Sequence, residues 1–467
     1  MLALDEYCQR VSIVRALGVC LLFPLGPLVV VILTECMPLQ PVEKGALANY
    51  VFWIRHTIIG AILVLCAMSQ AKIWISDMAL TMNQVVVVSI GSATVYTALN
   101  ILVADLWVFP IPFLVVTGAP LMFSIWAIVS RLVLGPHPLA GVQDGEFLGR
   151  RFLMLTAVHG SLLGIYPAYQ AIFLEVDGLL ELAMIALLPA VNLSLRNLQT
   201  ALGSHLEDNL PEVIIFSIDV FNAIYSVLCM HSANSIKMVA ITLASTTSSE
   251  APMLQKPSLS APRLFHLIQA RPSRPIVEPV VSPPRLSRLA VSALWQETSD
   301  KLIPIISRSN PVIGNILEET RKQNTRAVKQ TLQLLFNNEY LGLSAYTQCI
   351  IPAIYLMYMP VLQALPNHVY YPTHYRYFGE ANEFEERMTV IGVLFLLQLL
   401  VFIGLQVFVV KRFGVSTIYQ VAFVLENHFL LLQGKLLMWL IFAVQSTLEH
   451  YGVDFSFQFA WVHKGKA

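Results

Sequence analysis

The chain has 467 residues and a net charge of zero, from 29 basic and 29 acidic side chains. Charged residues make up 12% and hydrophobic residues 56% of the sequence, whereas soluble proteins usually carry roughly 25% charged residues. With a mean hydropathy of +0.66, the chain has more apolar surface than a water-soluble fold can bury. Composition therefore excludes a soluble globular protein and predicts an integral membrane protein. The zero net charge gives no reason to expect nucleic acid as a partner.

A helix needs about 20 mostly apolar residues to cross the hydrocarbon core of a bilayer. Ten segments of the sequence reach or approach this length, and they fall into two groups. The predicted segments are 16–34, 46–69, 78–103, 108–130, 152–174, 178–195 and 211–230, then 341–365, 389–410 and 427–448. The expected fold is all-α: a polytopic transmembrane helix bundle of nine or ten spans. We divide the chain into an N-terminal membrane region (1–231), a polar loop (232–340), a C-terminal membrane region (341–450) and a tail (451–467).

The loop changes character along its length. Residues 245–292 are rich in Ser, Pro and Arg, and because such a composition cannot bury much apolar surface, most of this part is expected to be disordered. Residues 312–338 contain few helix breakers, and Glu318 stands four residues before Lys322. This spacing supports a charged helix that extends the eighth segment beyond the membrane.

The distribution of basic residues predicts a cytoplasmic N-terminus. With that orientation, the short inside loops of the first half hold seven basic residues and the facing loops hold only Lys44. The seven are Arg10, Arg15, Lys72, Arg131, Arg150, Arg151 and Arg196. The second half, counted separately, also places the long loop inside. If the N-terminus and the loop are both cytoplasmic, the number of crossings between them must be even. Seven segments precede the loop, so either the loop is extracytoplasmic or an early segment does not cross fully. The seventh segment, which contains Glu212 and Asp219, and then the first are the candidates.

Ionisable residues inside apolar segments are the candidate functional residues, because a charge in hydrocarbon costs at least about 2.5–3.5 kcal/mol. Arg55 and His56 lie within the second segment, and Asp219 lies in the seventh with Asn222 on the same helical face. The specific hypothesis is a buried contact between Arg55 and Asp219. The alternative is that each side chain reaches an interface or pairs elsewhere.

A second set of polar residues completes the candidate pathway. Glu181 lies near the start of the sixth segment, and His159 lies in the fifth, where a structural hydrogen-bonding role is the simpler interpretation. Glu426 and Lys435 are interpreted as marking the start of the tenth segment. Gly160 and Gly164 form a GxxxG pattern, which favours close helix packing. The predicted pathway residues are therefore Arg55, His56, His159, Glu181, Glu212, Asp219 and Asn222.

Signatures of soluble catalysis are absent. The sequence contains no GxxxxGK[ST], GxGxxG, HExxH or GxSxG motif, and its six cysteines include no CxxC pair. We expect the cysteines to be small packing residues rather than disulfide or zinc ligands. No enzymatic activity, no cofactor and no metal site is predicted.

Three stretches resemble a large family of multi-pass membrane proteins from oomycetes. They are "LPEVIIFSIDVFNAIYSVLCM" from Leu210, "EYLGLSAYTQCIIPAIYLMYMPVLQALPNHVYYP" from Glu339 and "HYGVDFSF" from His450. The resemblance implies a shared architecture and assigns no site. It draws attention to Glu212, Asp219, Asn222, Glu339 and the Tyr370–Tyr371–Pro372 run, which stand within the matching phrases.

The predicted function is transport or conduction of a small solute or ion by a multi-pass membrane protein in a compartment that the sequence does not identify. Buried polar groups in a chain without soluble domains favour this interpretation. The alternative is a receptor or scaffold that acts through the 232–340 loop. That loop carries a Ser/Thr cluster at Thr246–Ser249 and a basic Pro-rich tract, which are suited to protein or anionic-lipid contacts. The lipid bilayer is the expected partner in both cases.

Overall fold

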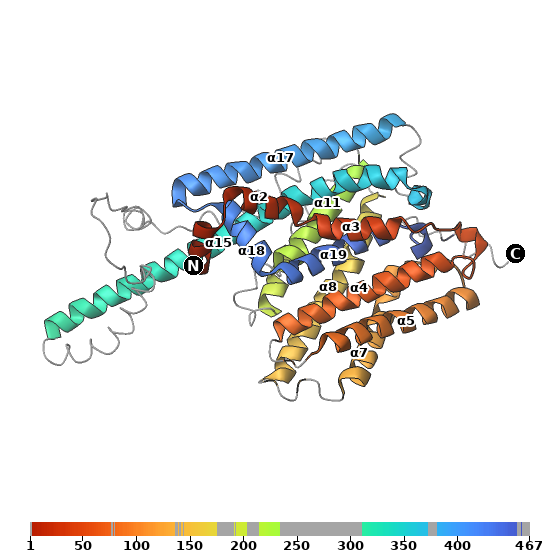
Figure 1. The fold of residues 1–467 in the computed structure, drawn as a ribbon, viewed down its shortest axis with the longest axis horizontal. Coiled ribbons are helices and arrows are strands. Elements are labelled where there is room, and N and C mark those ends of the chain that lie inside the picture. Colours follow the sequence, from red (N-terminus) through yellow and green to blue (C-terminus); the bar gives the residue numbers. More distant parts are fainter. Residues whose placement is uncertain are drawn as a thin grey trace.

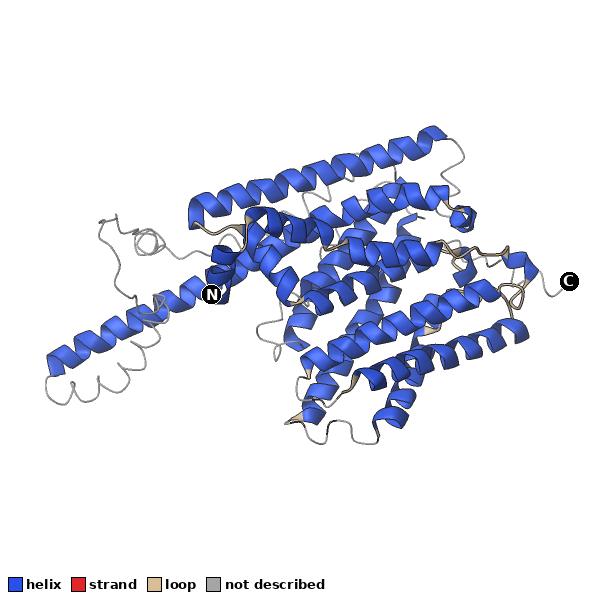
Figure 2. Cartoon of the chain, in the orientation of Figure 1, coloured by secondary structure: helices blue, strands red, loops and turns tan. Residues whose placement is uncertain are grey.

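The computed structural model describes residues 2–75, 78, 80–135, 139, 142, 144–174, 191, 193–202, 214–233, 311–371, 381–454 and 459. All regular structure in these ranges is helical, and no strand occurs among them (Figure 2). The longer helices are α1 (Leu2–Arg10), α2 (Ile13–Leu22), α3 (Leu25–Glu35), α4 (Tyr50–Trp74), α5 (Met82–Leu106), α7 (Ala119–Leu134), α8 (Gly145–Leu174), α11 (Val220–Ala233), α15 (Pro311–Ala364), α17 (Ala381–Phe413), α18 (Thr417–Asn427) and α19 (Phe429–Gln445). Short turns of helix are η1 (Val42–Lys44), α6 (Leu114–Thr117), the π-helical turn η3 (Ile215–Asp219), η4 (Pro366–Tyr370) and η5 (Glu449–Tyr451).

Six helical stretches in the described residues are long and apolar enough to cross a membrane: 13–35, 50–74, 82–106, 114–134, 336–364 and 384–413. Helices α18 and α19 count as a seventh span if they are taken together, although they meet at an angle of 89°. The described part of the chain therefore fits a multi-pass membrane protein, and nine or ten spans are not confirmed. The seventh predicted segment is a shorter apolar helix, Ile215–Leu228. Most of the sixth lies outside the described residues.

Helix α17 presents an apolar surface outward. Leu396, Leu400 and Phe408 are 57%, 64% and 51% exposed, and the helix lies along one side of the bundle (Figure 1). An exposed apolar face of this kind needs a partner other than water. Lipid is the partner that the composition of the whole chain predicts.

Four loops meet at one end of the bundle, which we call the capped end: 36–49, 107–113, 365–371 and 446–454. The amide nitrogen of Asn367 donates to the carbonyl oxygens of Glu35 and Met37, both at 2.7 Å. The backbone N–H of Phe113 donates to the carbonyl of Gly452 at 3.0 Å. These bonds satisfy backbone groups at helix ends and fix the relative positions of helices that are distant in sequence.

The opposite end, which we call the basic end, gathers the basic residues of both halves. It holds the N-terminus and the start of the α15 span (Figure 1), the ends of α4, α7 and α17, and the start of α8. Helix α11 runs in the same direction as α15, since Asp219 and Ser344 are hydrogen bonded near one end and Leu228 and Met359 line one cavity further along. The described basic residues that the two counts placed inside therefore lie at or beyond the same end, whereas α11 ends at Ala233 toward the capped end.

The predicted charged helix and the eighth predicted segment form one continuous helix, α15, of 54 residues. It extends past the basic end of the bundle (Figure 1). Predicted disorder of residues 245–292 lies outside the described residues.

Small residues allow close helix contacts at several crossings. A Cβ on Gly60 would lie 3.3 Å from the Cβ of Ala93 in α5, and one on Gly160 would lie 3.2 Å from the ring of Phe123 in α7. At Gly342 in α15 the approach is closer: a Cβ would lie 2.5 Å from Cγ2 of Thr417, the first residue of α18. This last site leaves no room for a side chain.

Replacing Gly342 with Ala is expected to lower the melting temperature in detergent. Overpacking a buried contact costs about 1–3 kcal/mol, which exceeds the roughly 0.5–1 kcal/mol gained by replacing a helical glycine with alanine. The double variant G342A/T417S, which lacks Cγ2, should recover most of the loss. Gly392→Ala is the matched control, because nothing lies within 4 Å of that position. Equal melting temperatures for G342A and G392A would contradict the packing at this crossing.

The orientation can be tested with the native cysteines, because Cys8 in α1 and Cys36 beside the capped end are both exposed. Basic residues favour the cytoplasmic side, so the basic end is expected to face the cytoplasm. In sealed microsomes with the cytoplasmic face outward, an impermeant maleimide should label a C36S/C229S variant through Cys8. It should label a C8S/C229S variant only after detergent is added. The reverse pattern would invert the orientation.

Candidate functional site

A buried ion pair joins the end of α3 to the first turns of α4. Nη1 of Arg55 donates to Oε2 of Glu35 at 3.0 Å, and Nη2 donates to the second carboxylate oxygen. Both side chains are fully buried. Nη2 also donates to the hydroxyl of Tyr371 at 3.2 Å. Two parallel bonds between a guanidinium and a carboxylate are the strongest geometry for such a pair, so each buried charge is compensated by the other.

The loop between α3 and α4 explains why these residues meet. Helix α3 ends and helix α4 begins at the capped end. Glu35, the last residue of α3, therefore lies at about the same depth as Arg55, which stands five residues after the start of α4. Asn367 holds this arrangement, since its side-chain oxygen accepts a bond from the backbone N–H of Leu39 at 3.0 Å while its nitrogen caps the end of α3. Removing one partner of such a buried pair typically costs about 3–5 kcal/mol, because the other charge is left uncompensated.

His56, next to Arg55, belongs to a separate group of uncharged polar residues. Its Nδ1 lies 3.1 Å from the hydroxyl of Tyr451, and its Nε2 lies 3.4 Å from the amide nitrogen of Asn100. The rings of Phe52 and Tyr96 lie 5.9 and 5.2 Å from the imidazole. His56 therefore connects α4, α5 and the loop after α19.

Asp219 is paired with Arg196. Its Oδ1 accepts bonds from Nε and Nη2 of Arg196 at 2.9 and 2.5 Å, and its Oδ2 accepts one from the hydroxyl of Ser344 at 3.2 Å. The hypothesis of an Arg55–Asp219 contact is therefore wrong, since each residue has a different partner. Arg196 had been assigned to an inside loop. The structure instead places it on a helical stretch, residues 193–202, with its side chain only 16% exposed.

The π-helical turn η3 supplies both Asp219 and Ser217. π-Turns are rare and occur often at functional sites. The hydroxyl of Ser217 lies 2.8 Å from Nε2 of His159 and accepts a bond from Nζ of Lys435 at 2.7 Å. The indole N–H of Trp439 donates to the carbonyl of Phe216 at 2.9 Å, which satisfies a backbone oxygen within the turn.

Lys435 does not mark the start of a span, contrary to the sequence interpretation. It lies inside α19, is fully buried, and its Nζ stands 5.5 Å from the centre of the Trp74 ring. Within the described ranges no ion pair involving Lys435 occurs. Glu426, the other residue of that interpretation, pairs with Arg15 at 3.1 Å.

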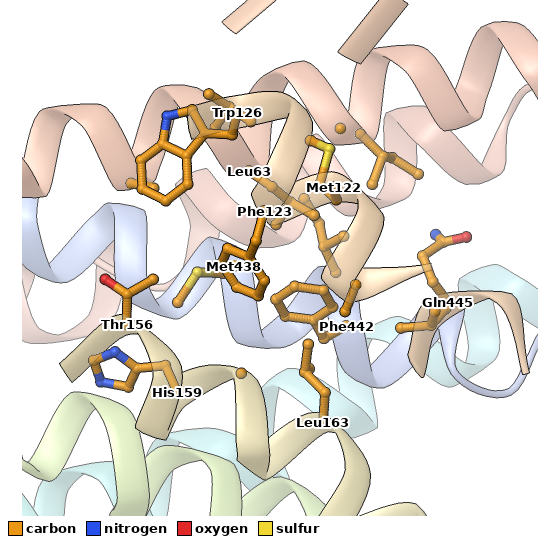
Figure 3. Close-up of a pocket in the computed structure, with 18 of the residues that line it drawn as sticks. Leu63, Met122, Phe123, Trp126, Thr156, His159, Leu163, Met438, Phe442 and Gln445 are labelled. Atoms are coloured by element: carbon orange, nitrogen blue, oxygen red, sulfur yellow. The ribbon is translucent and has the colours of Figure 1, made fainter. Parts of the chain in front are cut away.

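A cavity of about 140 Å³ lies between these polar groups. Its wall on the capped side includes His56, Tyr96 and Tyr451, and its wall on the basic side includes Gln70 and His159. Between them the lining is apolar and aromatic, with side chains from α4, α7, α8 and α19 (Figure 3). The apolar lining includes Leu63, Met122, Phe123, Trp126, Leu163, Met438 and Phe442. No Asp, Glu, Lys or Arg among the described residues contributes to it.

Two glutamines on the cavity wall have unused hydrogen-bonding groups. Gln445 is 3% exposed, and neither its amide oxygen nor its amide nitrogen has a partner among the described residues. Gln70 is 5% exposed, and its amide nitrogen also has none. A buried polar group without a partner costs about 1–3 kcal/mol, so such atoms identify a place where a further polar molecule would be stabilised.

Of the remaining predicted site residues, only some lie in the described structure near the cavity. Glu181 and Glu212 lie outside the described residues. Asn222 is partly buried and does not line the cavity; its side-chain oxygen has no partner in the described part of the chain. Gly160 lines the cavity, and a Cβ at Gly164 would lie 3.9 Å from Val116. Among the described residues no group of three His, Cys, Asp or Glu side chains could hold a metal ion.

Several important residues were missed from the sequence. Glu35 stands just beyond the first predicted segment, and Ser217 and Gln445 carry no charge that would single them out. The signal for Glu35 was its position opposite Arg55 across a short loop. For Ser217 and Gln445 no local signal exists, because their roles depend on contacts between helices far apart in sequence.

Together, the fold and the site define a multi-pass helical protein with apolar membrane-length helices and a neutral cavity between two buried ion pairs. No family model, no curated protein and no solved structure matches the chain. The resemblance to oomycete membrane proteins stays a prediction that these comparisons do not test.

His450, in the loop after α19, is buried at the capped end. Its Nε2 donates to the carbonyl of Gln40 at 2.8 Å, while its Nδ1 has no partner among the described residues. The rings of Tyr370 and Phe52 lie 4.9 and 5.4 Å away. Burial lowers the pKa of His450 from 6.5 to about 4, so the imidazole is neutral at pH 7.

Acidification is therefore expected to destabilise the capped end through His450. Between pH 6.5 and 4 the unfolded chain binds a proton that the folded chain does not. The free energy of unfolding therefore decreases as the pH is lowered, by about 3 kcal/mol over this window. The variant H450Q, which keeps a donor for Gln40, should lose less melting temperature between pH 7.5 and 5 than the wild type. Glu449 has the opposite effect on stability when the pH is lowered, because burial, and to a smaller extent the charge of Glu43, raise the pKa of its carboxyl group. An identical pH dependence for both proteins would contradict this account.

Proposed function

We propose that the protein transports a small, uncharged solute across a membrane through the core of its helical bundle. The observation that carries the proposal is the cavity with its unpartnered glutamine amides. It lies between helices of both membrane regions, where bundles commonly place ligand sites. Helices of membrane length and an outward apolar face supply the setting.

The cavity favours an uncharged solute over an ion. An ion that leaves water needs charged or closely spaced polar ligands to replace its hydration shell. Among the described residues, the side chains of the lining offer two imidazoles, two amides, two indoles and three hydroxyl groups, and otherwise carbon and sulfur atoms. Of the buried charged side chains near the cavity, Arg55 is paired with Glu35 and Asp219 with Arg196. Lys435 donates to Ser217 and does not line the cavity.

The two polar groups at the capped and basic ends of the cavity are suited to closing it. On the capped side His56 and Tyr451 contact each other across α4 and the loop after α19. On the basic side His159, Ser217 and Lys435 join α8, η3 and α19. Access from one side or the other requires one of these hydrogen-bonded groups to separate while the other holds, as alternating access demands.

The alternative, a receptor or scaffold that works through residues 232–340, stays a prediction. Most of that loop lies outside the described residues, and its protein or anionic-lipid partners are untested. The described part of the loop is the first section of α15, whose length brings it beyond the bundle.

Solute entry can be measured as swelling of proteoliposomes, by light scattering, over a panel of uncharged solutes from urea and glycerol to single-ring heterocycles. We expect at least one solute to enter faster than in empty liposomes. Leu163→Trp, which fills the cavity, should reduce the protein-dependent rate at least tenfold. Leu153→Trp on the same helix is the matched control, because Leu153 is 62% exposed and does not line the cavity.

Entry rates equal to those of empty liposomes for every solute would reject the transport proposal. A wild-type rate in L163W would reject the cavity as the route. Both variants must first show melting temperatures close to that of the wild type, so that a loss of rate is not a loss of folded protein.

A further inference from the structure

We propose that the cavity binds an uncharged, planar heterocycle of one six-membered ring whose edge carries adjacent C=O and N–H groups, as in uracil. The inference rests on the proposed function, since it names the substrate class of the same cavity. Its binding step can be measured without any transport.

The size of the cavity sets the first limit. An apolar cavity of about 150 Å³ in another protein holds one benzene molecule, and this cavity measures about 140 Å³. A single ring fits this volume. A fused, sugar-bearing or long-chain molecule does not fit without a change of structure.

The lining sets the second limit, which is flatness. The lining includes Phe123 and Trp126 from α7, Phe442 and Trp439 from α19, and the thioethers of Met122 and Met438. Figure 3 shows Phe123, Met438 and Phe442 close together near its centre. Aromatic rings attract one another in stacked and edge-to-face arrangements, and thioether sulfur contacts aromatic rings favourably. A planar ring makes better use of these surfaces than a branched aliphatic molecule of equal volume.

Gln445 sets the third limit, which is the pattern of hydrogen bonds. Its amide presents one acceptor and one pair of donors side by side, and in the described part of the chain neither the oxygen nor the nitrogen has a partner. The complement is a cis-amide edge, in which an N–H and a C=O stand next to each other and pair with the side chain through two bonds.

Charge sets the last limit. Because the described residues place no Asp, Glu, Lys or Arg on the wall, a charged ring would lose its hydration without compensation. A carboxylated ring is therefore excluded, although it has the same cis-amide edge. Polar uncharged heterocycles cross lipid slowly because their amide groups must give up water, so a protein route for them has a physical purpose.

The test uses the full chain in detergent and three probes. Uracil has the complete edge, 1,3-dimethyluracil lacks both N–H groups, and orotate adds a negative charge. Binding is followed by thermal stabilisation, and by quenching of tryptophan fluorescence with 5-bromouracil, because Trp126 and Trp439 line the cavity. We expect uracil and 5-bromouracil to bind, and the other two to bind at least tenfold more weakly.

Variants assign the binding to the cavity. Gln445→Leu keeps the size of the side chain and removes both hydrogen bonds, so uracil affinity should fall about tenfold, equivalent to about 1.4 kcal/mol. The affinity for 1,3-dimethyluracil should change little. Leu163→Trp should abolish binding, and Leu153→Trp should leave it unchanged.

Equal affinities for uracil and 1,3-dimethyluracil, or an unchanged uracil affinity in Q445L, would overturn the assignment, as would failure of uracil to bind. These outcomes are separate from the fate of the transport proposal. Binding of uracil without solute entry would reject transport and keep the site, whereas entry of other solutes without uracil binding would keep transport and reject this substrate class.

Discussion

The structure depends on the rule that a charge inside hydrocarbon must have a partner. Glu35 and Arg55 satisfy this rule for each other over two nearly parallel bonds, and the consequences extend through the capped end. Because Glu35 ends α3 and its backbone carbonyl is held by Asn367, the pair ties the first hairpin to the loop after α15. Tyr371 from the same loop adds a hydroxyl to the guanidinium. The next residue after Arg55 is His56, so the ion pair also fixes one wall of the cavity.

The second ion pair has a similar place on the other side of the bundle. Asp219 and Ser217 come from one π-turn, yet they serve different groups: Asp219 meets Arg196 and Ser344, and Ser217 meets His159 and Lys435. A regular α-helix would direct residues two apart to nearly opposite faces. The wider turn, held by Trp439, sets the directions in which these two side chains leave the backbone. The arrangement brings α8, α15, α19 and the 193–202 stretch to a single short segment.

The sequence predicted the long apolar helices well, because the hydrocarbon thickness demands runs of apolar residues that any sliding count detects. The segments 46–69 and 389–410 correspond to α4 and α17, with shifts of about three to eight residues at the ends. It predicted that Arg55, His159 and Asp219 face the interior, on the ground that charges avoid lipid, and all three are buried. It did not predict the partners, because pairing depends on which helices are neighbours. Glu35, the partner of Arg55, stands one residue beyond the boundary of the first predicted segment, so the rule that charges inside segments need partners does not single it out. The 89° bend at His428 and the glutamine amides of the cavity likewise carry no local pattern.

Helix α15 has a consequence of scale. The 25 residues before Phe336 add about 37 Å at the rise of an α-helix, more than the thickness of the hydrocarbon core itself. A rigid rod of that length, continuous with a transmembrane helix, acts as a lever: a tilt of ten degrees at the membrane moves its tip by about 6 Å. Small rearrangements of the packed helices would thus become large displacements in the aqueous phase.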